Sequence, residues 1–160
     1  MLYKSVVALA ASIMLTGAAL AAEPMMNAQD PAALIASLKE MGYAPDPIDA
    51  SSDSPSTVIT SGGSRYWIAL GGCTGKRDCG YMVVGSSFSD VVDPPIAWVA
   101  EQNKDFDLLK VWTNDQKQLT YSSSILTAGL TRAQFRAFMD ALTGSETALG
   151  NHASEAKLVK

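Results

Sequence analysis

Two spacings of apolar residues alternate along the chain, one helical and one strand-like. Helical spacing follows Asp30-Pro31, Pro95 and Thr131, and it predicts three helices. The remaining runs rich in β-branched and aromatic residues predict five strands, at 57–61, 65–71, 79–88, 107–113 and 118–125. The expected order of elements is therefore α-β-β-β-α-β-β-α.

The first two predicted helices have recognisable starts. Asp30 suits an N-cap and Pro31 a first helical position, because proline has no N–H to leave unpaired there. The second helix is expected to begin at Pro95, with Ile96, Val99 and Ala100 on its inner side.

The last predicted helix opens with a capping box. Thr131 is placed to cap the helix, and Gln134 follows three residues later to return the bond. Gly144 weakens the helical pattern, and we expect the helix to end near Leu149.

Cys73 and Cys79 flank a glycine-rich turn between the second and third predicted strands. Five residues separate them, so a hairpin loop can bring the side chains together. We expect a structural disulfide, which stabilises the fold by about 2.4 kcal/mol in the chain-entropy model. The alternative is a redox-active pair, because Lys76 and Arg77 could favour a thiolate. Two thiols without a nearby histidine make only half a zinc site, so we expect no metal.

The first 21 residues have the pattern of a secretory signal peptide. Lys4 supplies the positive charge, an apolar run extends from Val6 to Leu20, and Ala19-Leu20-Ala21 fits the small-x-small cleavage rule. We expect a mature chain that begins at Ala22 and is periplasmic or secreted from a bacterium, where disulfides persist. The apolar run is short for a membrane span, which is the alternative, and we expect no membrane insertion after cleavage.

The rest of the chain is long enough for one domain with its own core. Residues 22–30 are expected to form a flexible lead-in, 31–150 the folded domain, and 151–160 a disordered tail.

The charge balance argues against two classes of partner. The net charge is −4, and it becomes −5 when Lys4 leaves with the signal peptide. No basic residues cluster, so neither nucleic-acid binding nor attraction to anionic lipid is expected.

Residue sets that perform known chemistry are missing from the sequence. The single histidine, His152, lies in the expected tail, and no G-x-S-x-G or H-E-x-x-H motif occurs. Carboxylate pairs, Asp90 with Asp93 and Asp105 with Asp107, flank element ends, where solvated caps are the ordinary explanation. We therefore expect no enzymatic activity and no cofactor.

Several short motifs follow one another in a recognisable order: Gly72-Cys73, Cys79, Trp98 to Asn103 with Phe106, and Gly129-Leu130-Thr131. From about Pro31 to Leu149 this order resembles the YbjN-like family of bacterial sensory transduction regulators. Members often carry Gly-Gly where this chain has Ala128-Gly129, and many look cytoplasmic.

The resemblance implies an α+β fold like that of the type III secretion chaperones, with a single antiparallel sheet of about five strands and helices packed mainly on one face. Proteins of that class bind other proteins, often as dimers. The family has no assigned catalytic residues, so none is carried over to this chain.

So few helices can cover only one face of such a sheet. In the last strand, the alternation predicts a buried face and a solvent-exposed face, the latter made of Gln118, Thr120, Ser122 and Ser124. Alternation along the strands then places Trp67, Leu108 and Trp112 on the uncovered face. An exposed aromatic and aliphatic patch is typical of a protein-binding or dimer surface. The alternative is that these side chains pack under the loop at 43–55 or under the first helix.

The sequence is best interpreted as an exported, non-enzymatic protein-binding or regulatory domain, stapled by Cys73 and Cys79. It would act through its sheet face, and its partner would be another protein or a second copy. The rival hypothesis is a redox-active or small hydrolytic periplasmic enzyme that uses the cysteine pair or an unrecognised carboxylate site.

Overall fold

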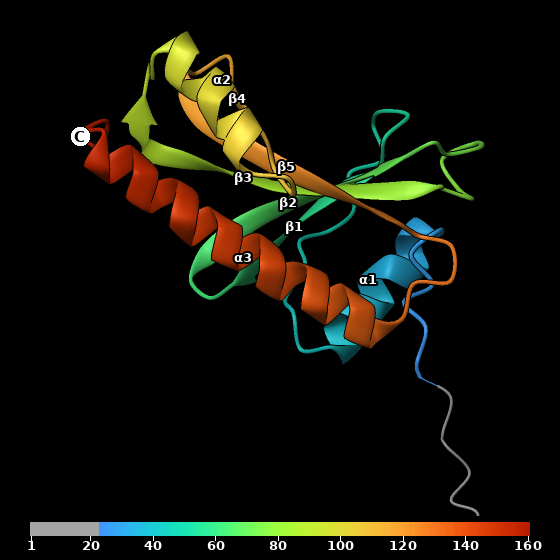
Figure 1. Ribbon diagram of the computed structural model, residues 1–160. Helices are drawn as coiled ribbons and strands as arrows, with labels where there is room; N and C mark the ends of the chain where they lie inside the picture. Colours follow the sequence, from blue (N-terminus) through green and yellow to red (C-terminus); the bar gives the residue numbers. More distant parts are fainter. Residues whose placement is uncertain (1–22) are drawn as a thin grey trace, which may run out of the picture.

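Five antiparallel strands form one sheet in the structure, a computed structural model that describes residues 23–160 (Figure 1). The elements in chain order are α1 (Pro31–Glu40), β1 (Ser56–Ser61), β2 (Ser64–Gly71), β3 (Tyr81–Val92), α2 (Ile96–Asp105), β4 (Lys110–Thr113), β5 (Gln118–Leu126) and α3 (Arg132–Glu155). The predicted α+β class and the predicted order of elements are confirmed. The predicted signal peptide, residues 1–21, lies outside the described residues.

The strands lie in the order β1-β2-β3-β5-β4. The first three form a meander, and the β4–β5 hairpin then joins the sheet through β5, which pairs with β3. The pairing of β3 with β5 shifts its register between Phe88 and Val92. The outer strands are β1 and β4, so β2, β3 and β5 are inner strands.

The helices cover one face of the sheet, which we call the helix side. Side chains of alternating strand residues on this face are fully or almost fully buried: Ile59, Tyr66, Ile68, Leu70, Met82, Val84, Leu119 and Tyr121. Helices α1 and α3 contribute Leu34, Leu38, Phe135, Met139, Leu142 and Leu149 to the same core. Figure 1 shows α3 running along this face, with α1 near its N-terminal end.

The predicted helix caps are present. The carboxylate of Asp30 accepts hydrogen bonds from the N–H groups of Ala32 and Ala33 at 2.9 and 3.0 Å. Thr131 and Gln134 form the predicted reciprocal capping box at the start of α3. These contacts satisfy N–H groups that the first turn of a helix leaves unpaired.

The predicted inner side of α2 is wrong in part. Val99 is buried as predicted, but Ile96 is 88% exposed and Ala100 is exposed. The second buried residue of α2 is Gln102. The rotation of a short helix depends on what it docks against, and here α2 contacts β4 at the sheet edge. A local apolar pattern does not contain that information.

The C-terminal residues are ordered in the structure, which differs from the expected tail at 151–160. Helix α3 continues without a break through Gly144 to Glu155. The ring nitrogen Nδ1 of His152 lies 2.9 Å from the side-chain oxygen of Gln102, and Val159 forms a β-bridge with Val91. Residues 151–160 are therefore held by contacts with α2 and β3, which are distant in sequence and leave no signal in the local composition.

The lead-in also has specific contacts. Met26 and Ala28 are fully buried, and the N–H of Met26 donates to the carbonyl of Leu130 at 2.9 Å. The segment lies between α1 and the β5–α3 connection, where it fills space that neither element closes alone.

Candidate functional site

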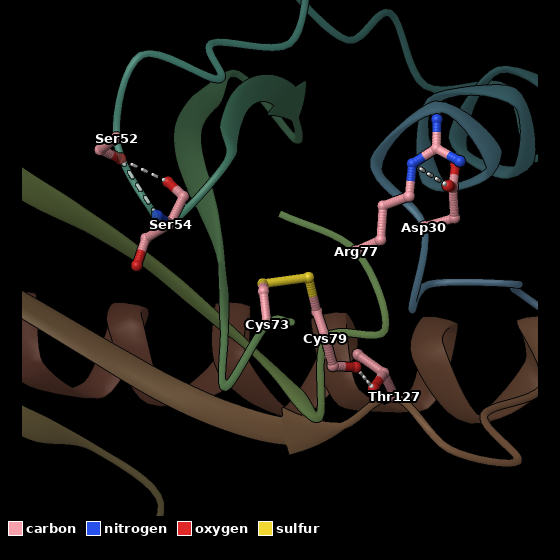
Figure 2. The surroundings of a disulfide bond; sticks show 7 residues. All are labelled: Asp30, Ser52, Ser54, Cys73, Arg77, Cys79 and Thr127. Carbon is pink, nitrogen blue, oxygen red and sulfur yellow. Dashed lines mark hydrogen bonds and ion pairs between the residues drawn. A yellow bond between two sulfur atoms is a disulfide. The ribbon is translucent and has the colours of Figure 1, made fainter. Parts of the chain in front are cut away.

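The disulfide between Cys73 and Cys79 closes the turn between β2 and β3 (Figure 2). Cys79 is fully buried, whereas Cys73 is half-buried. Gly72 and Gly75 in this turn have positive φ angles of 63° and 57°, which glycine adopts without steric cost. The predicted pairing of the two cysteines is therefore present in the structure.

Backbone groups of Cys79 connect the turn to two other segments. Its N–H donates to the carbonyl of Gln29 at 3.0 Å, and its carbonyl accepts a bond from the Thr127 hydroxyl. Figure 2 also shows the Arg77 guanidinium beside the Asp30 carboxylate, 3.7 Å from Nε to Oδ2. The disulfide turn thus fastens the lead-in, the start of α1 and the end of β5 together.

The face of the sheet opposite the helix side carries a different set of side chains, and we call it the open face. One row across the strands contains Trp67, Gly85, Ser122 and Lys110, which are successive register partners on β2, β3, β5 and β4. No helix of the described chain supplies a partner to this row. The open face is therefore where the sheet itself meets solvent.

A second row runs beside the first. It contains Ser87, Thr120 and Trp112 on β3, β5 and β4, and Arg65 continues it on β2. The hydroxyls of Ser87 and Thr120 lie 2.8 Å apart, in hydrogen-bond contact. The two rows place one indole and one cation on each side of a floor of small residues.

The Trp67 indole lies against Gly85. A Cβ atom at position 85 would overlap the ring and would also meet the carbonyl oxygen of Tyr121. The absence of a side chain at Gly85 is therefore what lets the indole lie flat on the sheet. A shallow hollow beside it is lined by Val58, Arg65, Trp67, Ser86, Ser87 and Gln116.

Two of the three residues predicted for a binding surface lie on the open face, and the third lies just before β4. Trp67 and Trp112 lie on the open face and are half-buried, while Leu108 lies in the bend before β4 and is 38% exposed. The loop at 43–55 bonds along the outer edge of β1 instead, through the N–H of Asp46 and the carbonyl of Val58 at 2.9 Å. The use of Trp67, Leu108 and Trp112 as a binding surface stays a prediction.

Two residues on the open face are more buried than their strand pattern suggests. The alternation in β5 predicts a wet face at Thr120 and Ser122, but they are only 4% and 5% exposed. Because β5 is an inner strand, the large side chains on β2 and β4 flank these short ones. The prediction of a wet face is wrong at these two positions.

Four further residues, not predicted from the sequence, share the open face with the tryptophans. Arg65 and Lys110 each precede a tryptophan by two positions on the same strand, which is the spacing that signals a shared face. Tyr81 and Leu126 are cross-strand partners farther along the same face, and both are exposed.

A polar cluster lies on the helix side, between α3 and the sheet. The Tyr66 hydroxyl donates to the carboxylate of Glu146 and lies 3.2 Å from the Thr143 hydroxyl. The hydroxyl of Tyr121 is buried beside this cluster and has no hydrogen-bond partner within the part of the chain that the structure describes. Burial, followed by the nearby Glu146 carboxylate, raises the pKa of both tyrosines above the usual value.

Two further observations bear on chemistry. Between residues 23 and 160, no group of three or more His, Cys, Asp or Glu side chains is placed to hold a metal ion. Within the same range, none of the helices has the length and apolar character needed to cross a bilayer.

Comparison with known proteins gives one match. The model of the YbjN family, described as "Putative bacterial sensory transduction regulator", matches residues 30–144. Neither a curated protein nor a solved structure matches the chain.

Proposed function

The chain belongs to the YbjN family, and from that premise we propose that it is a non-enzymatic regulator that binds a protein partner, or a second copy of itself, through the open face. The observation that carries this proposal is the pair of indoles, Trp67 and Trp112, on a sheet face that none of the helices between residues 23 and 160 covers. Tryptophan is among the residues that dominate protein interfaces, because it buries a large rigid surface and keeps a polar N–H.

The composition of the open face also suits reversible association. Its strand residues combine two indoles, Tyr81, Leu126 and several hydroxyls, a mixture typical of interfaces that form between stable monomers. By contrast, the Tyr66 and Glu146 cluster lies between α3 and the sheet, with Tyr66 fully buried and Glu146 half-buried.

The test replaces both tryptophans with serine. Trp67→Ser with Trp112→Ser is expected to abolish self-association, measured by sedimentation, or capture of a defined partner, while circular dichroism stays unchanged. The matched control is Ile96→Ser, which removes an exposed apolar side chain from α2 and leaves the strands unchanged. If both kinds of association survive in the folded tryptophan variant, the assignment to the open face is wrong.

We further propose that the protein works outside the cytoplasm, in the periplasm or the medium. The signal-peptide pattern of the first 21 residues and the disulfide between Cys73 and Cys79 both support this location. Intact mass spectrometry of the native product tests it. The expected mass is that of a chain beginning at Ala22 with two hydrogens missing, and a full-length reduced chain would contradict the proposal.

A further inference from the structure

The open face differs in charge from the rest of the molecule. The protein as a whole is acidic, with 16 Asp and Glu against 12 Lys and Arg. Yet the five strands contain a single carboxylate, Asp90, which lies within the stretch of β3 where the register shifts, near the C-terminal segment. In the two rows of the open face that contain Trp67 and Trp112, the only charged side chains are those of Arg65 and Lys110.

Both cations remain available to a partner. Arg65 has an ion pair with Asp46 at 3.2 Å, but both side chains are largely exposed, and such a pair is weak and leaves guanidinium donors free. The Lys110 ammonium lies 5.7 Å from the centre of the Trp112 ring and has no ion pair among residues 23–160. The other carboxylates of this region, Asp107 and Asp115, come only at the ends of β4.

The position of the two cations sets the size of a matching ligand. Arg65 and Lys110 stand on β2 and β4, three strand spacings apart, and one row apart along the strands. At about 4.8 Å per spacing this is about 15 Å, which is about five residues of an extended chain. Trp67 and Trp112 stand at the other two corners of the same patch, and the Trp67 indole reaches over Gly85 on β3, toward the middle of the patch.

A second copy of this chain fits the face less well. In a symmetric face-to-face dimer, the face of each copy would bring Arg65 and Lys110 and no carboxylate from the rows described above. Positive charge would then meet positive charge, which is unfavourable across an interface. An acidic partner has the complementary sign.

We propose that the open face binds an acidic polypeptide segment, with carboxylates at Arg65 and Lys110 and an apolar side chain against Trp67 and Trp112. This inference rests on the proposed function and adds the chemical class of the partner. The carboxylates supply selectivity and orientation, because exposed ion pairs contribute little affinity each. Contact with the indoles supplies most of the affinity.

The test is selection from a phage-displayed library of random peptides on the immobilised protein. The recovered peptides are expected to be enriched in Asp and Glu over the input, with an apolar residue between acidic positions. Arg65→Gln with Lys110→Gln is expected to lose this enrichment, and a recovered acidic peptide should bind that variant about tenfold more weakly at low salt. The matched control is Lys39→Gln with Lys104→Gln, which removes two exposed positive charges from helices and should keep the enrichment.

The outcomes separate this inference from the proposed function. Peptides that depend on Trp67 and Trp112 but are no more acidic than the input overturn the acidic partner and leave the binding face intact. Self-association through the tryptophans without peptide capture makes a second copy the occupant, and it also overturns the inference. Peptides that bind the Trp67→Ser, Trp112→Ser variant equally well overturn both proposals. If an acidic polysaccharide such as alginate binds as tightly as the recovered acidic peptides, charge alone is recognised, and the proposal of a polypeptide partner is overturned.

Discussion

The side-chain amide of Asn103 pairs with both backbone groups of Val111. Its Nδ2 donates to the Val111 carbonyl at 2.7 Å, and its Oδ1 accepts from the Val111 N–H at 2.8 Å. Val111 lies on β4, an outer strand, whose unpaired backbone groups could otherwise pair with a strand of another chain. Asn103, a residue of α2, thus makes the two backbone hydrogen bonds that a neighbouring strand would otherwise make with Val111.

Replacing Asn103 with alanine should therefore destabilise the fold. The variant loses three side-chain hydrogen bonds, one of them to the Val99 carbonyl, and it leaves the Val111 backbone groups without partners, which costs about 1–3 kcal/mol. Urea unfolding measures this loss, with Lys104→Ala as the neighbouring control on the exposed side of α2. Equal midpoints for the two variants would mean that water replaces the amide at no cost.

Gly85→Ala tests the seat of the Trp67 indole. The added methyl group would overlap the ring on one side and the Tyr121 carbonyl on the other. We expect a loss of about 1–3 kcal/mol and a shift in tryptophan fluorescence, because the indole must leave its place on the sheet. Gly80→Ala is the control, since its nearest neighbour there would be the Gly72 carbonyl at an ordinary 3.9 Å. An unshifted emission spectrum for Gly85→Ala would contradict this account of the indole.

The two buried tyrosines should respond differently to loss of their hydroxyls. Tyr66→Phe removes a donor from Glu146 and a contact with Thr143, and should cost about 1–2 kcal/mol. Tyr121→Phe removes a buried hydroxyl that has no partner, so stability should be unchanged or slightly higher. Chemical denaturation of the two single variants compares them directly. A larger loss for Tyr121→Phe would indicate a bound water at that hydroxyl.

The same tyrosines predict sensitivity to alkali. Burial and the Glu146 carboxylate raise the pKa of Tyr66 and Tyr121 in the folded state. Above about pH 10 the unfolded chain therefore releases tyrosine protons that the folded chain retains, so stability is full below that pH and falls as the pH rises. The expected slope is about 1.4 kcal/mol per pH unit for each tyrosine.

Unfolding measured between pH 8 and pH 11 checks this slope. Wild type is compared with Tyr66→Phe and with the double variant Tyr66→Phe, Tyr121→Phe, and each substitution should flatten the dependence. Parallel curves for all three proteins would assign the alkaline loss to other groups.

The disulfide is expected to act as a structural staple. Replacing Cys73 and Cys79 with serine raises the conformational entropy of the unfolded chain, and it should reduce the free energy of unfolding by about 2.4 kcal/mol. Thiol titration of the folded wild type in glutathione buffers provides the second measurement. Resistance to reduction supports the staple, whereas ready cycling would favour the redox hypothesis.

Local patterns were sufficient for most of the fold. Asp30 with Pro31, and Thr131 with Gln134, mark helix starts because capping satisfies N–H groups within a few residues. The opposite orientation of Tyr66 and Trp67 follows from the two-residue period of a strand. These features depend on neighbours in sequence, and the sequence contains those neighbours.

The candidate face needed more than strand alternation. The pattern placed Trp67 and Trp112 on one face, but only the strand order β1-β2-β3-β5-β4 put Gly85, Thr120 and Ser122 between them. Strand order depends on which edge the β4–β5 hairpin joins, a choice made by contacts far apart in the chain.

By itself, the sequence determined the element types, the helix caps, the cysteine pair and the side of the sheet to which each strand residue points. The tertiary structure alone decided that Lys110 shares a row with Trp67, that Asn103 closes the edge at Val111, and that α3 reaches Glu155 against α2 and β3. The reason is physical: caps and alternation are short-range effects, whereas packing across a sheet joins residues whose separation in the chain leaves no local pattern.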